Sequence, residues 1–247
     1  MTRTPLALVC LVISLGVSAS AFGQTPTEEA LRLTAAYHED PTRIDRARDL
    51  LEQALGRDRR VETMIALSRV YVLVGLVRAR TPDEKLAAFE RGREVGKRAT
   101  ELAPRSEDAH FWYVANTGLF GQTKGVLRSL ALLPTMREEI EILLALNPRA
   151  ARTHNVAANV LFEVPAILGG DRTKAEEHWR KGIELDPHYT VQRVDYAKML
   201  IATGRYDEAR RELGTVLDEK AATNRADWTV RDVPRARAML DAIRDKR

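Results

Sequence analysis

The sequence predicts an all-α protein: a solenoid of about five helix pairs with a C-terminal capping helix. Three observations support this. Apolar residues recur at three- and four-residue steps, helix start and stop signals follow one another along the chain, and one block of sequence returns at a nearly constant interval. No comparable stretch shows the period-two alternation of a half-buried strand.

Residues 1–23 are predicted to be a secretory signal peptide. Arg3 gives a positive start, residues 6–19 form an apolar run, and Ala19-Ser20-Ala21 is a small-x-small cleavage pattern, with cleavage after Gly23 as the alternative. The apolar run is shorter than the ~20 residues of a membrane-spanning helix, so an uncleaved anchor is the weaker interpretation. We therefore expect a periplasmic or secreted bacterial protein without firm membrane insertion.

Cysteine and charge exclude several classes of function. Cys10, the only cysteine, lies inside the apolar run, so the mature chain is expected to lack disulfides, thiolate metal sites and a cysteine nucleophile. The formal net charge is +4 and charged residues make up 30% of the chain. Acids and bases interleave, as in residues 84–101, which predicts solvated helix faces rather than a nucleic-acid patch.

Helix starts and stops can be located along the chain. Thr25 and Thr81 each stand directly before a Pro and three residues before a Glu, which is the capping-box spacing with Pro at the first helical position. Thr135 has the same spacing to Glu138 and predicts a third start. The apolar stripe in residues 83–103 predicts one long helix. Helix ends are predicted before Pro104, Pro148 and Pro187.

An internal repeat organises these helices. Residues 114–121 (VANTGLFG) align with residues 156–163 (VAANVLFE), and residues 196–204 align with the same block at an offset of about 40 residues. Each copy begins a helix pair, and such pairs bury their apolar faces by stacking into a solenoid with an extended groove. We expect one repeat domain over 24–247, with a capping helix from about Pro234.

Residues 195–217 resemble a tetratricopeptide repeat (TPR). Small residues are needed at its matching positions because the two helices of a pair cross closely. The second helix before this segment matches in the same phase. Together, the repeat positions of structural importance are Ala175, Trp179, Gly182, Pro187, Ala197, Gly204, Tyr206 and Ala209.

The sequence Gly169-Gly170-Asp171 raises a choice between a phosphate-binding loop and a turn. A phosphate loop requires a buried strand before it, and Pro165 argues against one. The glycines also match neither phosphate-loop signature. We therefore predict that Gly169 or Gly170 ends the first helix in a left-handed turn and that Asp171 caps the next helix.

A longer resemblance covers roughly residues 98 to 219. It is similar to the T-component family of TPR-associated tripartite ATP-independent periplasmic (TRAP) transporters, and it implies a periplasmic protein that associates with the transporter's solute-binding subunit. Members are often lipid-anchored, whereas this chain lacks the lipoprotein cysteine. The residues that carry the resemblance are Gly169, Gly170, Asp171, Lys174, Ala175, Trp179 and Pro187.

Signals for catalysis are weak. The five histidines, at positions 38, 110, 154, 178 and 188, have no metal-ligand spacing, and no serine lies in a GxSxG context. We expect no metal, no cofactor and no catalytic residue. An enzyme would have to be built from residues distant in sequence.

Polar and aromatic residues on the first helices of the central pairs are the candidate binding surface, because first helices line the inner groove of such solenoids. A non-catalytic assembly protein, with a TRAP transporter as one candidate partner, is the leading hypothesis. A stand-alone ligand or peptide binder is the second, and an enzyme the third. The predicted groove residues are His110, Trp112, Tyr113, Asn116, His154, Asn155, Asn159 and Arg193, with Asp195 and Tyr196 beside them.

Overall fold

The computed structural model describes residues 25–246, so the predicted signal peptide lies outside the described part of the chain. Within this range the chain forms helices and no strand. None of these helices is both long and apolar enough to cross a membrane. The helices are α1 (Pro26–Ala35), α2 (Thr42–Arg57), α3 (Val61–Leu73), η1 (Val74–Arg78), α4 (Pro82–Leu102), α5 (Glu107–Lys124), η2 (Val126–Leu132), α6 (Leu133–Leu146), α7 (Ala151–Glu163), η3 (Ala166–Leu168), α8 (Arg172–Leu185), α9 (Thr190–Ala202), α10 (Tyr206–Asp218), α11 (Arg225–Asp227), η4 (Trp228–Asp232) and α12 (Val233–Ala242).

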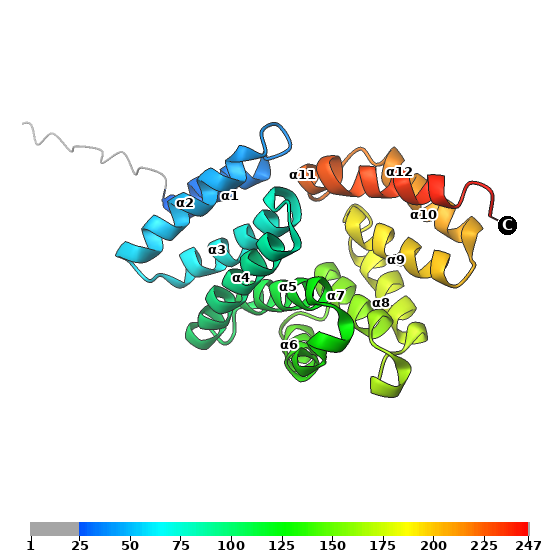
Figure 1. Cartoon of the computed structure of the whole chain (residues 1–247), viewed down its shortest axis with the longest axis horizontal. Coiled ribbons are helices and arrows are strands. Elements are labelled where there is room, and N and C mark those ends of the chain that lie inside the picture. Colours follow the sequence, from blue (N-terminus) through cyan, green and yellow to red (C-terminus); the bar gives the residue numbers. More distant parts are fainter. Residues whose placement is uncertain (1–24, 247) are drawn as a thin grey trace, which may run out of the picture.

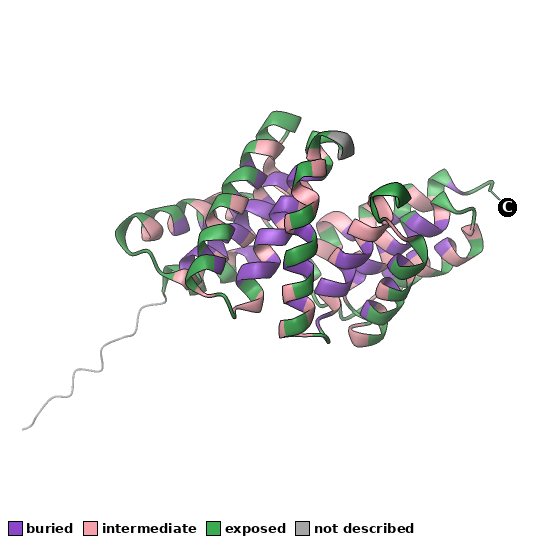
Figure 2. Cartoon of the chain, turned by 90° about the horizontal axis from the view of Figure 1, so that it is seen from below, coloured by how far each residue is buried: buried purple, intermediate pink, exposed green. Residues whose placement is uncertain are grey.

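The helices form five antiparallel pairs, from α1/α2 to α9/α10, followed by the capping segment α11, η4 and α12. The predicted all-α solenoid is therefore confirmed. The pairs curve around one side so that α11 comes to lie beside α1 (Figure 1). Buried residues lie mainly where neighbouring helices pack, and the outer faces and connecting loops are exposed (Figure 2).

Local sequence signals account for most helix boundaries. Thr25 and Thr81 both form complete capping boxes, as predicted. The prediction for Thr135 is wrong, because α6 begins at Leu133 with Pro134 in its first turn, so Thr135 already lies inside the helix. Asp171 caps α8 by accepting a hydrogen bond from the Lys174 backbone N–H at 3.0 Å.

The glycine pair before α8 forms a structural turn of a different kind from the one predicted. Helix α7 ends at Glu163, and a short 3-10 turn follows before Gly169 takes the left-handed conformation at φ 87°. Gly169 therefore ends the 3-10 turn rather than α7. A Cβ atom on Gly170 would lie 1.7 Å from the Val164 carbonyl oxygen, so the backbone leaves no room for a side chain there.

Close helix crossings explain the small residues of the repeat. Ala175, Ala197 and Ala209 are fully buried. A Cβ atom on Gly182 would lie 2.5 Å from Gln192 Oε1 and 3.3 Å from the Ala151 carbonyl oxygen, so α8 approaches its neighbours too closely for any side chain there. Trp179, Tyr206 and the turn residue Gly204, with φ 76°, complete this region, and Pro187 follows α8.

Candidate functional site: a concave cavity

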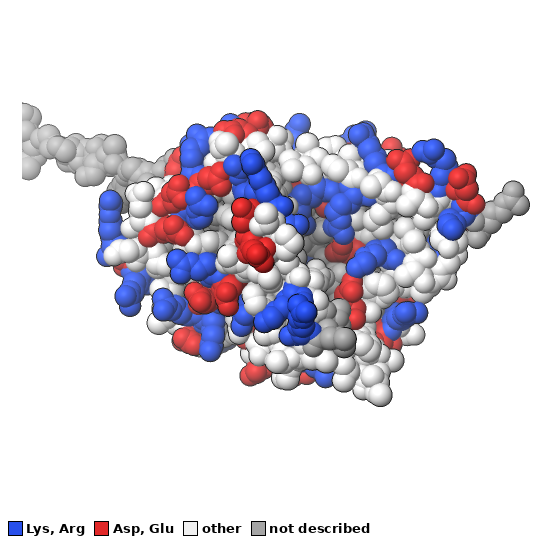
Figure 3. All heavy atoms as spheres, in the orientation of Figure 1, with Lys and Arg blue, Asp and Glu red and all other residues white. Residues whose placement is uncertain are grey.

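The concave side of the solenoid encloses a cavity of about 630 Å³. Its walls come from the first helices α3, α5, α7 and α9, from η2, and from the capping segment. In the space-filling view a hollow opens near the centre of the face, with basic and acidic side chains around it (Figure 3). A volume of this size falls in the range of small-molecule sites, which is ~300–1,000 Å³.

The capping segment closes the curve of the solenoid. Ala226 is fully buried in the apolar core of the N-terminal helices, and Val230 packs against the same core. Trp228 packs instead against the C-terminal core and donates a hydrogen bond from Nε1 to the Val216 carbonyl oxygen at 2.8 Å. The segment from α11 to η4 therefore joins the two ends of the solenoid and completes the cavity wall.

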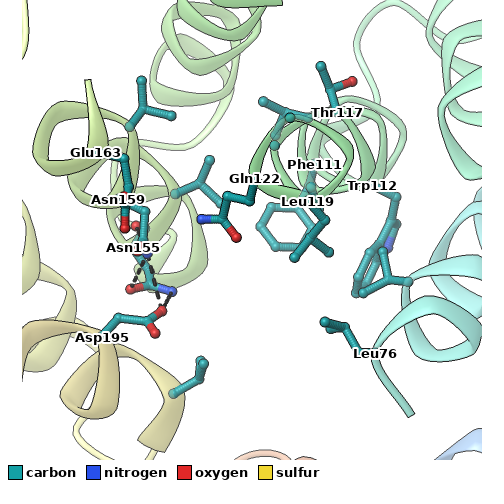
Figure 4. Close-up of a pocket in the computed structure, with 18 of the residues that line it drawn as sticks. Leu76, Phe111, Trp112, Thr117, Leu119, Gln122, Asn155, Asn159, Glu163 and Asp195 are labelled. Carbon is teal, nitrogen blue, oxygen red and sulfur yellow. Dashed lines mark hydrogen bonds between the residues drawn. The ribbon is translucent and has the colours of Figure 1, made fainter. Parts of the chain in front are cut away.

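Two walls of the cavity differ in chemistry. Leu76, Trp112 and Leu119 lie on one side, and Asn155, Asn159 and Asp195 lie on the other (Figure 4). The apolar side extends onto residues of η2, α6 and α7 that also line the cavity, among them Leu132, Met136, Val156 and Val160. The site is thus amphipathic, with apolar surface facing a polar wall.

The polar wall is largely satisfied by its own contacts. Asn155 Oδ1 accepts a hydrogen bond from the buried Trp179 Nε1 at 2.9 Å. The Nδ2 atoms of Asn155 and Asn159 each donate to Asp195 Oδ2 at 3.2 Å. Asp195 also pairs with Arg235 at 2.7 Å, and Lys198 pairs with Glu163. Because these charges are matched, this wall carries little spare binding capacity for an ion.

Arg69 differs from the polar wall in having no acidic partner among the described residues. It lies on α3, and its guanidinium group sits 5.5 Å from the centroid of the Trp112 ring. Within residues 25–246 it makes no hydrogen bond and no ion pair within 4.0 Å. Burial lowers the pKa of Arg69, while the nearby charges of Asp227 and Asp108 act in the opposite direction. A guanidinium cannot be deprotonated at physiological pH, so the described part of the cavity contains an unpaired cation.

Tyr189 provides a second free polar group. Its side chain lines the cavity, and its hydroxyl makes no hydrogen bond to any described residue. Burial raises the pKa of Tyr189, so the hydroxyl stays protonated and can donate. Arg69 and Tyr189 lie close enough to interact electrostatically. Two donors in one cavity, neither with an acceptor among the described residues, are suited to binding an anion.

Of the eight predicted groove residues, Trp112, Asn155 and Asn159 line the cavity. His110, His154 and Arg193 do not. All three occupy one repeated position, six residues after the Pro that precedes their helix, and each contacts that Pro carbonyl oxygen: His110 with Pro104 at 3.0 Å, His154 with Pro148 at 3.0 Å and Arg193 with Pro187 at 3.4 Å. Each also pairs with the second helix of its own repeat, namely with Glu139, His178 and Glu212 respectively. They connect the helices within a pair instead of facing the groove.

Tyr113 and Asn116 also lie away from the cavity, on the side of α5 that packs against α3 and α4. Asn116 Nδ2 donates to the Ser68 carbonyl oxygen at 2.9 Å. The Cβ position of Gly96 lies 3.0 Å from Tyr113 Cα, so Tyr113 sits at a close helix crossing. The sequence assigned these residues to the correct helix but to the wrong face.

The sequence interpretation missed Arg69 and Tyr189. A weak signal for Arg69 existed, since it is the only charged residue after Glu62 in the apolar helix α3. For Tyr189 there was none, because a tyrosine at the start of a helix is common in proteins without a binding site. The involvement of Asn224, Asp227 and Arg231 from the capping segment depends on the closure of the solenoid, which no local pattern reveals.

Comparison with known proteins places this architecture in a family. The family described as "Regulator of microtubule dynamics protein 1-3" matches residues 27–244. The chain belongs to this family. The match spans all five helix pairs and the capping segment, so the family comprises the whole closed solenoid. It is a different family from the T-component family that the sequence resembles.

One solved structure supports the same fold, and others are less similar. A thermophilic TPR protein of Thermus thermophilus, TTC0263, aligns with 85% of this chain and 98% of its own at 23% identity and a TM-score of 0.63. MamA aligns with 75% of this chain and 93% of its own at 18% identity and a TM-score of 0.44. A comparison with curated protein sequences finds no match. The family member described here therefore has a TPR-like fold.

Proposed function

We propose that the chain is a non-catalytic binding protein that holds an apolar molecule carrying one anionic group in its concave cavity. The observation that carries this proposal is Arg69, which is unpaired among the described residues and lines the same cavity as Tyr189, whose hydroxyl makes no hydrogen bond to a described residue. A partly buried, desolvated cation without an ion-pair partner lowers the stability of a protein, so its presence in a cavity wall is best explained by a ligand that supplies the missing anion.

The rest of the cavity supports the same class of ligand. Trp112 lies against Arg69, and Leu76 and Leu119 add apolar surface in the same cavity. A ligand that reaches from the guanidinium across this surface would bury its apolar part as well as pair its charge. Favourable burial of apolar area supplies most of the affinity, and the charge-assisted hydrogen bonds fix the orientation. This favours the ligand-binding hypothesis over a scaffold that uses only its outer surfaces.

The location and the protein partner form a second part of the proposal. The predicted signal peptide supports a periplasmic protein, and the resemblance of residues 98 to 219 to the TRAP T-component family supports association with a solute-binding subunit. A TPR-like fold is suited to such a contact. Co-purification of a transporter's solute-binding subunit with the mature protein from the periplasm would support this part, and its absence there would remove it.

The cavity is tested with two fluorescent probes that differ in one group. Anilinonaphthalene sulfonate carries a sulfonate, and phenylnaphthylamine has the same aromatic body without the charge. We expect the wild-type protein to prefer the sulfonate, and Arg69→Met to weaken sulfonate binding about tenfold or more while leaving phenylnaphthylamine unchanged. Arg105→Met, at an exposed position away from the cavity, is the matched control. Equal loss of both probes, or no loss of either, would rule out an anion site at Arg69.

A further inference from the structure

His154 on α7 and His178 on α8 face each other across one helix pair, outside the residues that line the cavity. Their Nδ1 atoms lie 2.9 Å apart and their ring centroids 5.1 Å apart. His154 is buried, whereas His178 is half-buried and reachable from solvent. One nitrogen of each ring therefore faces a nitrogen of the other ring at hydrogen-bond distance, at a site that His178 leaves partly open to solvent.

The second nitrogen of His154 fixes which nitrogen carries the proton. Its Nε2 atom lies 3.0 Å from the Pro148 carbonyl oxygen, which can only accept a hydrogen bond. Nε2 must therefore carry the proton in the neutral ring, and Nδ1 presents its lone pair to His178. Histidine ligands of metal ions are typically held in this way, with the other ring nitrogen donating to a backbone carbonyl or a carboxylate.

The equivalent positions in the neighbouring repeats differ. His110 meets the carboxylate of Glu139 at 2.6 Å, and Arg193 meets the carboxylate of Glu212 at 2.6 Å. Both arrangements join a nitrogen donor to an acidic acceptor. In the α7/α8 pair both partners are histidines. His178 stands where the other two pairs have the carboxylate of Glu139 or Glu212.

From this geometry we infer that His154 and His178 form a two-histidine site for a divalent transition-metal ion. In neutral His178 the proton can move to Nε2, which leaves both Nδ1 lone pairs without a proton between them. Two metal–nitrogen bonds of ~2.0–2.1 Å place the nitrogens about 2.9 Å apart at the ~90° angle of a tetragonal Cu²⁺ site, and about 3.3 Å apart at the tetrahedral angle of a Zn²⁺ site. The observed Nδ1 separation of 2.9 Å matches the first value, and the second requires an outward movement of the half-buried His178 ring.

The remaining coordination positions fall to water. Within residues 25–246 no third His, Cys, Asp or Glu joins the pair in a group that could hold a metal. Imidazole ligands suit Cu²⁺, Ni²⁺ and Zn²⁺, and Cu²⁺ binds most tightly of these in the usual order of affinities. The two histidines are 24 residues apart, which explains why no spacing motif revealed them.

The experiment uses the untagged mature protein, titrated with Cu²⁺ at pH 7.5 and followed by calorimetry and electron paramagnetic resonance. We expect one Cu²⁺ per chain, with a spectrum showing two imidazole nitrogens. His178→Ala should weaken binding at least tenfold and remove the two-nitrogen spectrum. His188→Ala, which changes a histidine on another part of the surface, should preserve both.

A melting curve of each variant separates loss of the site from loss of the fold. His178→Gln is the second variant, because glutamine preserves a polar side chain at this half-buried position. Equal Cu²⁺ affinity in the wild type and in a folded His178 variant would overturn the inference. So would a spectrum without two imidazole nitrogens in the wild type, and the pair would then be a hydrogen bond within the repeat.

Discussion

Tyr37 donates a hydrogen bond from its hydroxyl to Asp227 Oδ1 at 2.5 Å, although the two residues are 190 positions apart. Tyr37 follows α1 and Asp227 ends α11, so this bond links the first helix pair to the capping segment. Asp227 is also contacted by Asn224 at 2.6 Å and by Arg231 at 3.4 Å. The bond is therefore part of a small polar network beside the apolar contacts of Ala226 and Val230, and together they close the solenoid.

Tyr37→Phe tests this closure. Removal of the hydroxyl should lower the free energy of unfolding by about 1 kcal/mol, because Asp227 loses a buried donor while the ring stays in place. Chemical denaturation measures the effect. Tyr206→Phe is the matched control, since the Tyr206 hydroxyl makes no hydrogen bond to a described residue, and it should be almost neutral. Equal effects of the two changes would show that the closing bond adds nothing to stability.

The position of Gly182 leads to a second prediction. A methyl group there must displace the Gln192 side chain and approach the Ala151 carbonyl, so Gly182→Ala should destabilise the protein by ~1–3 kcal/mol. Gly214 on α10 has no atom within 4 Å of its Cβ position. Gly214→Ala should therefore stabilise the protein by up to ~1 kcal/mol, through helix propensity alone. Thermal melts of the two variants should shift in opposite directions, and shifts of the same sign would contradict the close crossing.

The repeat period and the small residues made the fold predictable from sequence. Both are local consequences of helix packing: apolar stripes must face a neighbour, and a close crossing admits only Ala or Gly, as at Ala175 and Gly182. The capping boxes at Thr25 and Thr81 are equally local, because donor and acceptor lie within four residues. Features of this kind leave a spacing in the sequence that can be recognised.

The site was less predictable because it depends on side-chain direction and on distant contacts. Residues on α5 such as Asn116 and Trp112 are one helical turn apart, yet one is buried and the other reaches the cavity. A polar residue on a first helix can face the groove or its own partner helix, and His154 shows that it often does the second. The Tyr37–Asp227 contact has no spacing rule at all.

Asn155 shows the consequence for mutagenesis. The sequence placed Asn155 among the groove residues, but its Oδ1 atom is also the acceptor for the buried Trp179 Nε1. Asn155→Ala should therefore cost ~1–3 kcal/mol of stability, since the indole N–H would lose its partner in the core. Asn155→Asp retains an acceptor and should recover much of this loss. Unfolding curves decide the matter, and an unchanged Asn155→Ala curve would mean that water replaces the lost acceptor.

Asp232 gives the protein a defined pH response. Burial raises the pKa of Asp232 to about 6, although Thr190 donates a hydrogen bond to it at 2.7 Å. The folded state thus holds this proton more tightly than the unfolded chain, whose pKa is near 3.8. The contribution of the protonated Asp232 to the free energy of unfolding is at its full value below pH ~4, and it is lost as the pH rises through about 6.

Asp232→Asn removes this titration. As the pH rises from 4 to 7, the free energy of unfolding of the variant should increase relative to that of the wild type. The rise in the pKa of Asp232 from 3.8 to about 6 corresponds to up to about 3 kcal/mol. Denaturation at a series of pH values measures the difference. Asp218→Asn, at an exposed position, should show a flat difference. A flat difference for Asp232→Asn as well would show that the pKa of Asp232 is the same in the folded and the unfolded protein.

Arg69 leads to the final prediction, in which stability and binding change in opposite directions. The guanidinium is desolvated by the cavity wall and lacks an acidic partner among the described residues, so in the empty protein it costs free energy that no ion pair returns. Arg69→Met retains the apolar stem over Trp112 and should stabilise the empty protein by about 1 kcal/mol. The same change should abolish the preference for the sulfonate probe.

Arg205→Met is the contrasting variant, because Arg205 pairs with Glu176 at 2.6 Å and with Glu208 at 2.7 Å. Its loss should destabilise the protein without affecting either probe. Residues kept for binding commonly reduce stability, whereas residues kept for the fold do not. If Arg69→Met destabilises the protein as Arg205→Met does and leaves probe binding intact, then Arg69 serves the fold, and the cavity takes its ligand through other groups.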